Sequence, residues 1–298
     1  MKKIIVTGAN GFIGSELIKK CVENEIEVVA IDISFENSKL PENKLIKMIE
    51  SNLENIDELV DLISTSDYDA FYHLAWAGVN GANKADPLVQ VKNIELAVKC
   101  ANIAKQLNVK KFLCAGTVAE KSVDSLADLQ TTSGGMMYGV AKHCAHLILE
   151  TYCKNIGINF IWMQFSNIYG PKNKTGNLIS YTIEELKKNN EASFGPALQP
   201  YDFVLVNDLI EAVYRLGKCE NTKHFYFIGS GKPRILKEYL YEIGNQCDKR
   251  ELINIGARLD DGIKYSYEMF DIEALTTDIG YYVTMNYEDG IRYTLENY

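Results

Sequence analysis

Short apolar runs rich in Ile, Val and Phe alternate with longer amphipathic stretches over the first two-thirds of the chain. A strand buried on both faces of a parallel sheet is continuously apolar, whereas a helix with one buried face repeats its apolar residues every three or four positions. By these rules the sequence predicts strands at 3–7, 27–33, 70–75, 111–115 and 159–165. It predicts helices at 11–25, 56–63, 87–107 and 137–155.

The order of these elements indicates the fold class. Alternating strands and helices predict an α/β fold in which a parallel sheet carries helices on both faces. Further along, the pattern predicts strands near 202–206 and 224–228 and helices at 207–216 and 236–245. We expect a second lobe to begin at the polar loops 169–176 and 194–200.

Charge and composition narrow the possible partners. The chain has 298 residues and a net charge of −9, which argues against nucleic acid or an anionic membrane surface as a partner. Its apolar runs are far shorter than the roughly 20 residues of a membrane-spanning helix. Seven cysteines without a C-x-x-C pair indicate reduced, mostly buried thiols and a cytoplasmic location.

Three glycines separate the first predicted strand from the helix after it, in the sequence Gly8-Ala-Asn-Gly11-Phe-Ile-Gly14. Glycines at this point allow a sharp turn, a close approach of backbone to a pyrophosphate and tight packing of the helix on the sheet. The N–H groups at the helix start then face the phosphates. The alternative interpretation is a plain tight turn.

Asp32 follows Gly14 by 18 residues, at the end of the second predicted strand. A carboxylate there can accept hydrogen bonds from both ribose hydroxyls of an adenosine and would repel a 2′-phosphate. NAD(H) is therefore favoured over NADP(H), although NADP remains possible. The alternative is a solvated acid in a turn.

Tyr138 and Lys142 lie one helical turn apart, which places a phenol and an ammonium on the same face. A tyrosine titrates near pH 10, and a neighbouring ammonium together with a positively charged nicotinamide would lower its pKa by favouring the phenolate. Tyr214 and Lys218 have the same spacing, so spacing alone does not identify a catalytic pair. Tyr138, however, follows a strand of the predicted sheet, with Thr117 just past its carboxyl end, where ligands of such sheets bind.

In this order, the motifs resemble the extended short-chain dehydrogenase/reductase family, specifically the NAD-dependent epimerase/dehydratase group that acts on nucleotide sugars. The resemblance covers nearly the whole chain and rests on 7–14, His73-Leu-Ala75, Asn93, Thr117, Tyr138-x-x-x-Lys142, Asn167-Ile-Tyr-Gly170-Pro171, 202–208 and 227–232. It implies a Rossmann-type doubly wound parallel sheet with a smaller C-terminal α+β lobe. Residues 1–165 with about 199–228 would form the NAD(P)-binding domain, and 166–198 with 229–298 the lobe that binds a nucleotide-diphosphate sugar.

The resemblance also assigns roles within the site. Tyr138 would move the proton on the sugar oxygen, Lys142 would lower the pKa of Tyr138 and hold the nicotinamide ribose, and Thr117 would hydrogen-bond the same oxygen. The expected cofactor-binding residues are Gly8, Asn10, Gly11, Phe12, Ile13, Gly14, Asp32, Ile33, Leu53, Leu74, Ala75, Trp76, Asn93, Ala115, Tyr138 and Lys142. The expected substrate-binding residues are Ala77, Thr117, Asn167, Gln199, Tyr201 and Arg258.

Two further expectations concern metals and assembly. No metal is expected, and His143 and His146 are given a structural or interface role because no acidic or cysteine partner has suitable spacing. The resemblance implies a homodimer formed through the helices at 87–107 and 137–155.

Several positions depart from the family pattern. Val118 and Ala119 stand where the 4,6-dehydratases carry Asp-Glu, the acid–base pair that eliminates water, so dehydration is disfavoured. Glu120 next to them is interpreted as a solvated loop acid rather than an acid–base residue.

Two family arginines are also replaced, by Gln164 and Tyr201. The second commonly holds a substrate phosphate, a role that Arg234 or Arg258 could take over here.

Three functions remain open. The leading hypothesis is a reductase of 4-keto-(6-deoxy)sugar nucleotides that consumes NADH or NADPH. The alternative is an epimerase that retains its NAD and returns the hydride to the opposite face of the sugar. A non-catalytic NAD(H)-binding sensor is disfavoured because Tyr138 and Lys142 are both present.

Overall fold

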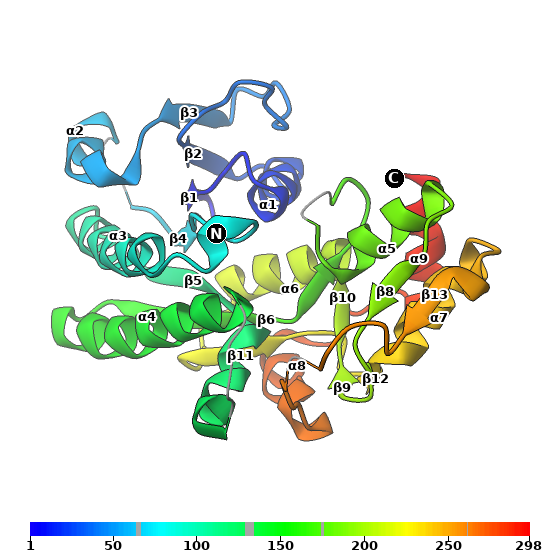
Figure 1. Cartoon of the computed structure of the whole chain (residues 1–298). Helices are drawn as coiled ribbons and strands as arrows, with labels where there is room; N and C mark the ends of the chain where they lie inside the picture. Colours follow the sequence, from blue (N-terminus) through cyan, green and yellow to red (C-terminus); the bar gives the residue numbers. More distant parts are fainter. Residues whose placement is uncertain (64–66, 129–133, 174–175, 261) are drawn as a thin grey trace.

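The computed structural model describes residues 1–63, 67–128, 134–173, 176–260 and 262–298. Its centre is a seven-stranded parallel sheet with the strand order β11-β6-β5-β4-β1-β2-β3 (Figure 1). The strands are β1 (Lys3–Thr7), β2 (Glu27–Asp32), β3 (Ile46–Glu50), β4 (Ala70–His73), β5 (Lys111–Thr117), β6 (Asn159–Phe165) and β11 (Phe225–Ile228). The predicted doubly wound parallel sheet is confirmed.

The central strands form because their side chains are apolar on both faces. Ile4, Ile5 and Val6 of β1 are completely buried, and so are Leu113 and Cys114 of β5. The strand order reverses its direction of growth between β1 and β4, which opens a crevice at the carboxyl ends of the strands. This crevice is the place where ligands bind in folds of this class.

Helices cover both faces of the sheet (Figure 1). Helices α3 (Pro87–Gln106) and α4 (Gly134–Ile156) pack side by side on one face, and α1 (Phe12–Glu23) packs with α6 (Val206–Lys218) on the other. Helix α3 begins where the sequence predicts, because Asp86 caps it by accepting hydrogen bonds from the N–H groups of Leu88 and Val89. None of the helices in the described ranges is both long enough and apolar enough to span a bilayer.

The C-terminal part adds a smaller α+β layer. Three two-stranded sheets pair β7 (Asn167–Tyr169) with β10 (Phe203–Leu205), β9 (Pro200–Tyr201) with β12 (Arg234–Ile235), and β8 (Ala192–Phe194) with β13 (Ile253–Ile255). Its helices are α5 (Leu178–Lys187), α7 (Leu236–Gln246) and α9 (Tyr287–Glu296), while α8 (Glu273–Ile279) packs against α6 and β11. A separate core, centred on Ile183, Leu240 and Ile291, holds α5, α7 and α9 together.

Some predicted elements are wrong in extent. The helix expected at 56–63 is instead the end of a 3-10 segment (Leu53–Glu58), which has non-helical dihedral angles at Asn55, followed by the four-residue α2 (Leu59–Leu62). The strand expected at 70–75 ends at His73. Its last two expected residues, Leu74 and Ala75, border the crevice, and the N–H of Leu74 still donates to the carbonyl of Thr7 on β1.

Candidate active site

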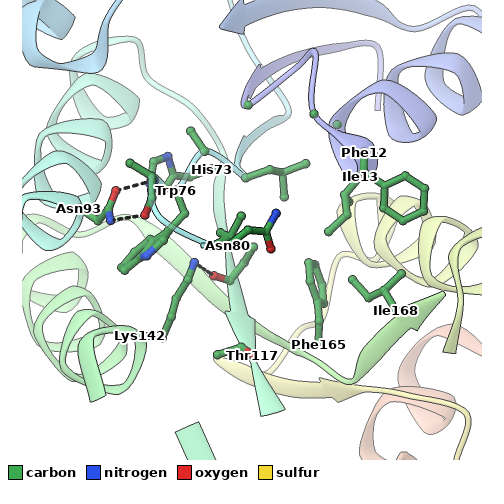
Figure 2. A pocket seen from close by; sticks show the side chains of 18 of the residues that line it. Phe12, Ile13, His73, Trp76, Asn80, Asn93, Thr117, Lys142, Phe165 and Ile168 are labelled. Atoms are coloured by element: carbon green, nitrogen blue, oxygen red, sulfur yellow. Dashed lines mark hydrogen bonds between the residues drawn. The ribbon is translucent and has the colours of Figure 1, made fainter. Parts of the chain in front are cut away.

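A cavity of about 580 Å³ opens along the carboxyl ends of the strands (Figure 2). Phe12 and Ile13 lie on one side of it, Trp76 and Asn93 lie on the other, and Thr117 and Lys142 lie between them at one end. The predicted residues that line it are Gly8, Gly11, Phe12, Ile13, Gly14, Asp32, Ile33, Leu53, Leu74, Ala75, Trp76, Ala77, Asn93, Ala115, Thr117, Tyr138, Lys142 and Asn167. The fold therefore gathers segments that lie more than half the chain apart.

The glycine loop is as tight as the sequence predicts. Gly8 has a φ of +72°, and a Cβ atom there would come within 2.7 Å of the backbone nitrogen of Ala75. A Cβ atom on Gly14 would overlap the carbonyl oxygen of Gly8. Helix α1 begins at Phe12, so its first N–H groups border the cavity.

Asp32 lies at the end of β2 beside this loop. Its two carboxylate oxygens each accept one backbone N–H group, from Asn10 and from Ile33, both at 2.8 Å. Each oxygen keeps a second lone pair for a ribose hydroxyl. Asn10 itself supports the loop, because its side chain bonds to Ser34 and Lys39 and it is not among the cavity-lining residues.

The loop after β4 is fixed by the long helix α3. The amide of Asn93 accepts a hydrogen bond from the N–H of Ala77 and donates one to its carbonyl, both at 2.8 Å. The indole of Trp76 donates to Gln90 at 2.9 Å. Asn93 therefore shapes the cavity by holding this loop in place.

Buried polar atoms face the same space. His73 pairs its Nδ1 with the hydroxyl of Thr7 at 2.8 Å, while its Nε2 has no partner within the described part of the chain. With the glycine loop and the Asp32 carboxylate, the cavity has the chemistry that a dinucleotide requires: backbone donors for phosphates, an acid for a ribose and apolar walls for the rings.

Lys142 occupies the end of the cavity that holds the catalytic candidates. Its ammonium donates to the carbonyl of Ala115 at 2.6 Å and lies 3.7 Å from the centroid of the Trp76 ring and 6.0 Å from that of Tyr138. Burial lowers the pKa of Lys142 to about 8, and the nearby Cys114 and Glu120 oppose this shift.

The pKa of Tyr138 shifts in the direction opposite to the expectation. Burial raises it above the ordinary value, Glu120 raises it further, and a hydrogen bond with Thr117 only partly opposes them. The lowering expected from Lys142 is therefore not found for the chain alone, because burial and the Glu120 carboxylate raise this pKa, while the Lys142 ammonium lies 6.0 Å from the ring centroid.

The interpretation of Glu120 as a solvated acid is also wrong. Its residue is only 3% exposed, and its carboxylate accepts hydrogen bonds from the N–H of Thr117 at 2.6 Å and the indole of Trp162 at 3.0 Å. Burial raises its pKa to about 7. This burial was hard to predict from the sequence, because an acid three residues after a strand end is usually exposed.

A second cavity of about 300 Å³ adjoins the first in the C-terminal layer. It brings together three expected substrate residues, Gln199, Tyr201 and Arg258. Arg258 donates to the hydroxyl of Tyr181 at 2.8 Å. Arg234, the other candidate for a phosphate contact, instead forms a two-point ion pair with Glu288 at 2.6 and 3.3 Å.

Sequence reasoning missed several lining residues. In the first cavity they include Ser51, Asn52, Val79, Asn80, Leu96, Gly116, Phe165, Ser166, Ile168, Asn173, Asn177, Leu178 and Phe203. In the second they include Ser193, Phe194, Gly195, Pro196, Ala197, Leu236, Leu259, Asp260, Ile263 and Tyr265. Asn177 was detectable, since it caps α5 ahead of apolar residues at helical spacing.

The histidine pair and the second tyrosine–lysine pair of the sequence analysis are not among the residues that line the two cavities. His146 stacks on Trp162 with ring centroids 4.9 Å apart and the rings nearly parallel. In the described ranges no three His, Cys, Asp or Glu side chains gather to hold a metal ion. Tyr214 and Lys218 lie on α6, with their side chains 3.4 Å apart, and are not among the lining residues of the catalytic cavity.

The fold and the cavity define a class: a Rossmann-type enzyme that binds a dinucleotide and carries a threonine, a tyrosine and a lysine beside it. A model of the NAD dependent epimerase/dehydratase family matches residues 4–229, more than half of the chain. The chain belongs to this family and is an NAD-dependent enzyme of the extended short-chain dehydrogenase/reductase type.

Several characterised proteins are similar over almost the full length. CDP-abequose synthase of Salmonella muenchen is 26% identical, with 98% of this chain and 96% of the relative covered. The dTDP-4-dehydro-6-deoxyglucose reductase of Escherichia coli is 24% identical, with 97% and 95% covered. The solved UDP-glucose 4-epimerase of Thermotoga maritima superposes with a TM-score of 0.82 at 20% identity, over 99% and 97% of the two chains, which shows the shared fold.

Proposed function

We propose that this protein is a reductase of nucleotide-diphosphate 4-keto-6-deoxysugars. The observation that carries the proposal is the meeting of Thr117, Tyr138 and Lys142 at one end of the cavity, with the apolar Val118 and Ala119 following Thr117. Elimination of water needs an acid–base pair at those two positions, whereas reduction of a ketone does not. Two relatives that match almost the whole chain carry names consistent with deoxysugar reduction.

The protonation of the site favours reduction. At neutral pH the Tyr138 phenol keeps its proton, because burial and Glu120 hold its pKa above the ordinary value. Tyr138 can therefore donate that proton to the ketone oxygen while Thr117 donates a hydrogen bond to the same atom. Lys142 carries positive charge below about pH 8 and would offset the charge left on the phenolate. NADH, when bound along the glycine loop, supplies the hydride.

The nucleotide end of the substrate would occupy the second cavity. Gln199 offers an amide, Tyr201 an aromatic ring and Arg258 a guanidinium to a nucleoside diphosphate. Asn167 and Ala77 line the first cavity and would face the sugar. The division of the chain into a cofactor domain (1–165 with about 199–228) and a substrate lobe (166–198 with 229–298) belongs to this proposal.

An NAD-retaining 4-epimerase is the second candidate, and one observation favours it. Each oxygen of Asp32 accepts one backbone N–H group and keeps a lone pair for a ribose hydroxyl. This favours NAD(H) over NADP(H), and NAD is the cofactor that an epimerase would retain and recycle. A homodimer through α3 and α4 is also proposed, since Leu88, Val91, Leu147 and Ile148 on these helices are exposed apolar residues.

The cofactor content of the purified protein separates the two candidates. The protein is denatured and released NAD(H) and NADP(H) are quantified by chromatography. An empty site that binds NADH reversibly, and oxidises it when CDP- or dTDP-4-keto-6-deoxyglucose is added, supports the reductase. Stoichiometric bound NAD, with isomerisation of a sugar nucleotide and no net oxidation, overturns it in favour of the epimerase.

A further inference from the structure

A buried carboxyl group lies directly behind the proposed catalytic residues. Glu120 belongs to the 3-10 helix Val118–Asp128, which follows β5 and packs against α4. Its Oε1 accepts the backbone N–H of Thr117 at 2.6 Å. The acid thus holds the turn that presents the Thr117 hydroxyl to the cavity.

The same carboxylate ties this turn to the neighbouring strand. Both of its oxygens lie within hydrogen-bond distance of the Trp162 indole nitrogen, at 3.0 and 3.2 Å. A Cβ atom on Gly116 would overlap that nitrogen and come within 2.6 Å of Glu120 Oε1. The missing side chain at 116 is therefore what allows the indole and the carboxylate to meet across β5.

Gln164 completes the surroundings of the acid. Its side chain hydrogen-bonds Glu120, and its amide oxygen is buried without a partner within the described part of the chain. If the amide rotates by half a turn, this oxygen can accept a hydrogen bond from the O–H of a neutral Glu120. The pair can thus satisfy both protonation states of the acid.

Charged and titratable groups face Glu120 from each element packed on it. They are Cys114 on β5, Lys121 on its own helix, and Tyr138 and Lys142 on α4. The carboxylate raises the pKa of both Tyr138 and Lys142, so its charge favours the phenol and the ammonium together. His146 stacks on a face of the Trp162 ring.

We propose that Glu120 is a positioning residue of the active site: its carboxylate fixes the Thr117 turn and keeps Tyr138 protonated and Lys142 charged. This inference rests on the catalytic use of Thr117, Tyr138 and Lys142 under the proposed function. It also predicts that a proton leaves Glu120 near neutral pH, which can be measured without any substrate.

Fluorescence provides the test that does not depend on activity. The chain has two tryptophans, so Trp76→Phe leaves Trp162, the indole bonded to Glu120, as the sole emitter. The emission of this variant should change in one step near pH 7, where Glu120 titrates, and the step should vanish in Trp76→Phe/Glu120→Gln. A change in emission caused by the titration of His146 should instead occur near pH 4, so it can be told apart from the step of Glu120. The absence of a step near pH 7 in Trp76→Phe alone, or its persistence in the double variant, overturns the proposal.

The pH profile of kcat/KM tests the electrostatic role. The basic limb of this profile is the fall of kcat/KM at high pH. Removing the charge in Glu120→Gln should move this limb to lower pH by about one unit, because the pKa values of Tyr138 and Lys142 both fall. Glu120→Asp keeps the charge but shortens the arm to Thr117, so it should lower kcat while the limb stays in place. A limb that does not move in Glu120→Gln, or moves equally far in Glu120→Asp, overturns the proposal. If no substrate is turned over, the proposed function fails while the fluorescence result still stands.

Discussion

The ammonium of Lys142 lies 3.7 Å from the centroid of the Trp76 ring, so the lysine is held between an indole face and the carbonyl of Ala115. A desolvated cation–π contact of this kind is worth about 2 kcal/mol. Trp76 is in turn fixed by Gln90, which accepts a hydrogen bond from its indole nitrogen. An aromatic residue on the loop after β4 therefore sets the position of a lysine on α4.

Replacing Trp76 with Ala should free Lys142 and lower kcat/KM by about tenfold or more, as expected from the loss of a buried cation–π contact. Trp76→Phe keeps a ring beneath the ammonium and should retain most of the activity. The measurement is kcat/KM for NADH oxidation with the 4-keto sugar nucleotide. Equal activity of Trp76→Ala and the unmodified protein would show that the contact is not used.

Tyr138→Phe should lower turnover by about 10²- to 10⁴-fold while NADH binding stays within a few-fold, because only the transferred proton is lost. The chain offers a matched control in Tyr214, which has the same spacing to a lysine on α6 but does not line the catalytic cavity. Tyr214→Phe should leave turnover unchanged. Similar losses in both variants would mean that the phenol of Tyr138 has no special role.

These two tyrosines show how far the sequence alone could reach. The strand–glycine–helix pattern at 3–23 and the strand ends at Asp32 and Thr117 depend on local sequence, so the sheet and most of the cofactor cavity were predictable. The burial of Glu120 was not, because it depends on Trp162 from a strand far along the chain and on the space left by Gly116. Local patterns carry no information on such long-range contacts.

The C-terminal layer was predicted less well for a related reason. Its strands are two or three residues long and pair across large separations, as Ala192–Phe194 does with Ile253–Ile255. Segments this short have no measurable periodicity. The edge strand Ile46–Glu50 was missed because most of its residues are exposed or polar, so it lacks the continuous apolar run of the central strands.

Asp32→Asn should reduce the preference for NADH over NADPH. The carboxylate that accepts ribose hydroxyls and repels a 2′-phosphate is lost, and we expect NADH affinity to fall by about tenfold while NADPH affinity rises. Glu36→Gln, which removes an exposed acid on the following loop, is the control for net charge. The readout is the ratio of the two dissociation constants. A ratio that moves equally in both variants would assign the effect to long-range charge rather than to Asp32.

Gly8→Ala should abolish cofactor binding and destabilise the fold. Its φ of +72° is strained for alanine, and the added methyl would lie 2.7 Å from the Ala75 nitrogen. Gly81→Ala is a matched control, since Gly81 also has a positive φ, +65°, but has no atom within 4 Å of the added methyl. The control should cost about 1–3 kcal/mol, the strain of an alanine at the backbone angles of Gly81 (φ +65°, ψ −159°), and should leave NADH binding intact. Urea unfolding and NADH titration measure both effects, and equal losses in the two variants would exclude the steric explanation.

His73 should make the fold sensitive to mild acid. Burial lowers its pKa to about 3, whereas the unfolded chain binds a proton near pH 6.5. Between these values the unfolded state holds more protons than the native state, so stability falls as the pH drops below about 6.5, by about 2 kcal/mol for this group at pH 5. The free energy of unfolding in urea, measured at pH 7 and pH 5, should therefore decrease less in His73→Asn than in the unmodified protein. His146→Asn provides the comparison, because the pKa of His146 is also lowered, to about 4. Equal acid sensitivity of His73→Asn and the unmodified protein would show that His73 takes up a proton while the chain is folded.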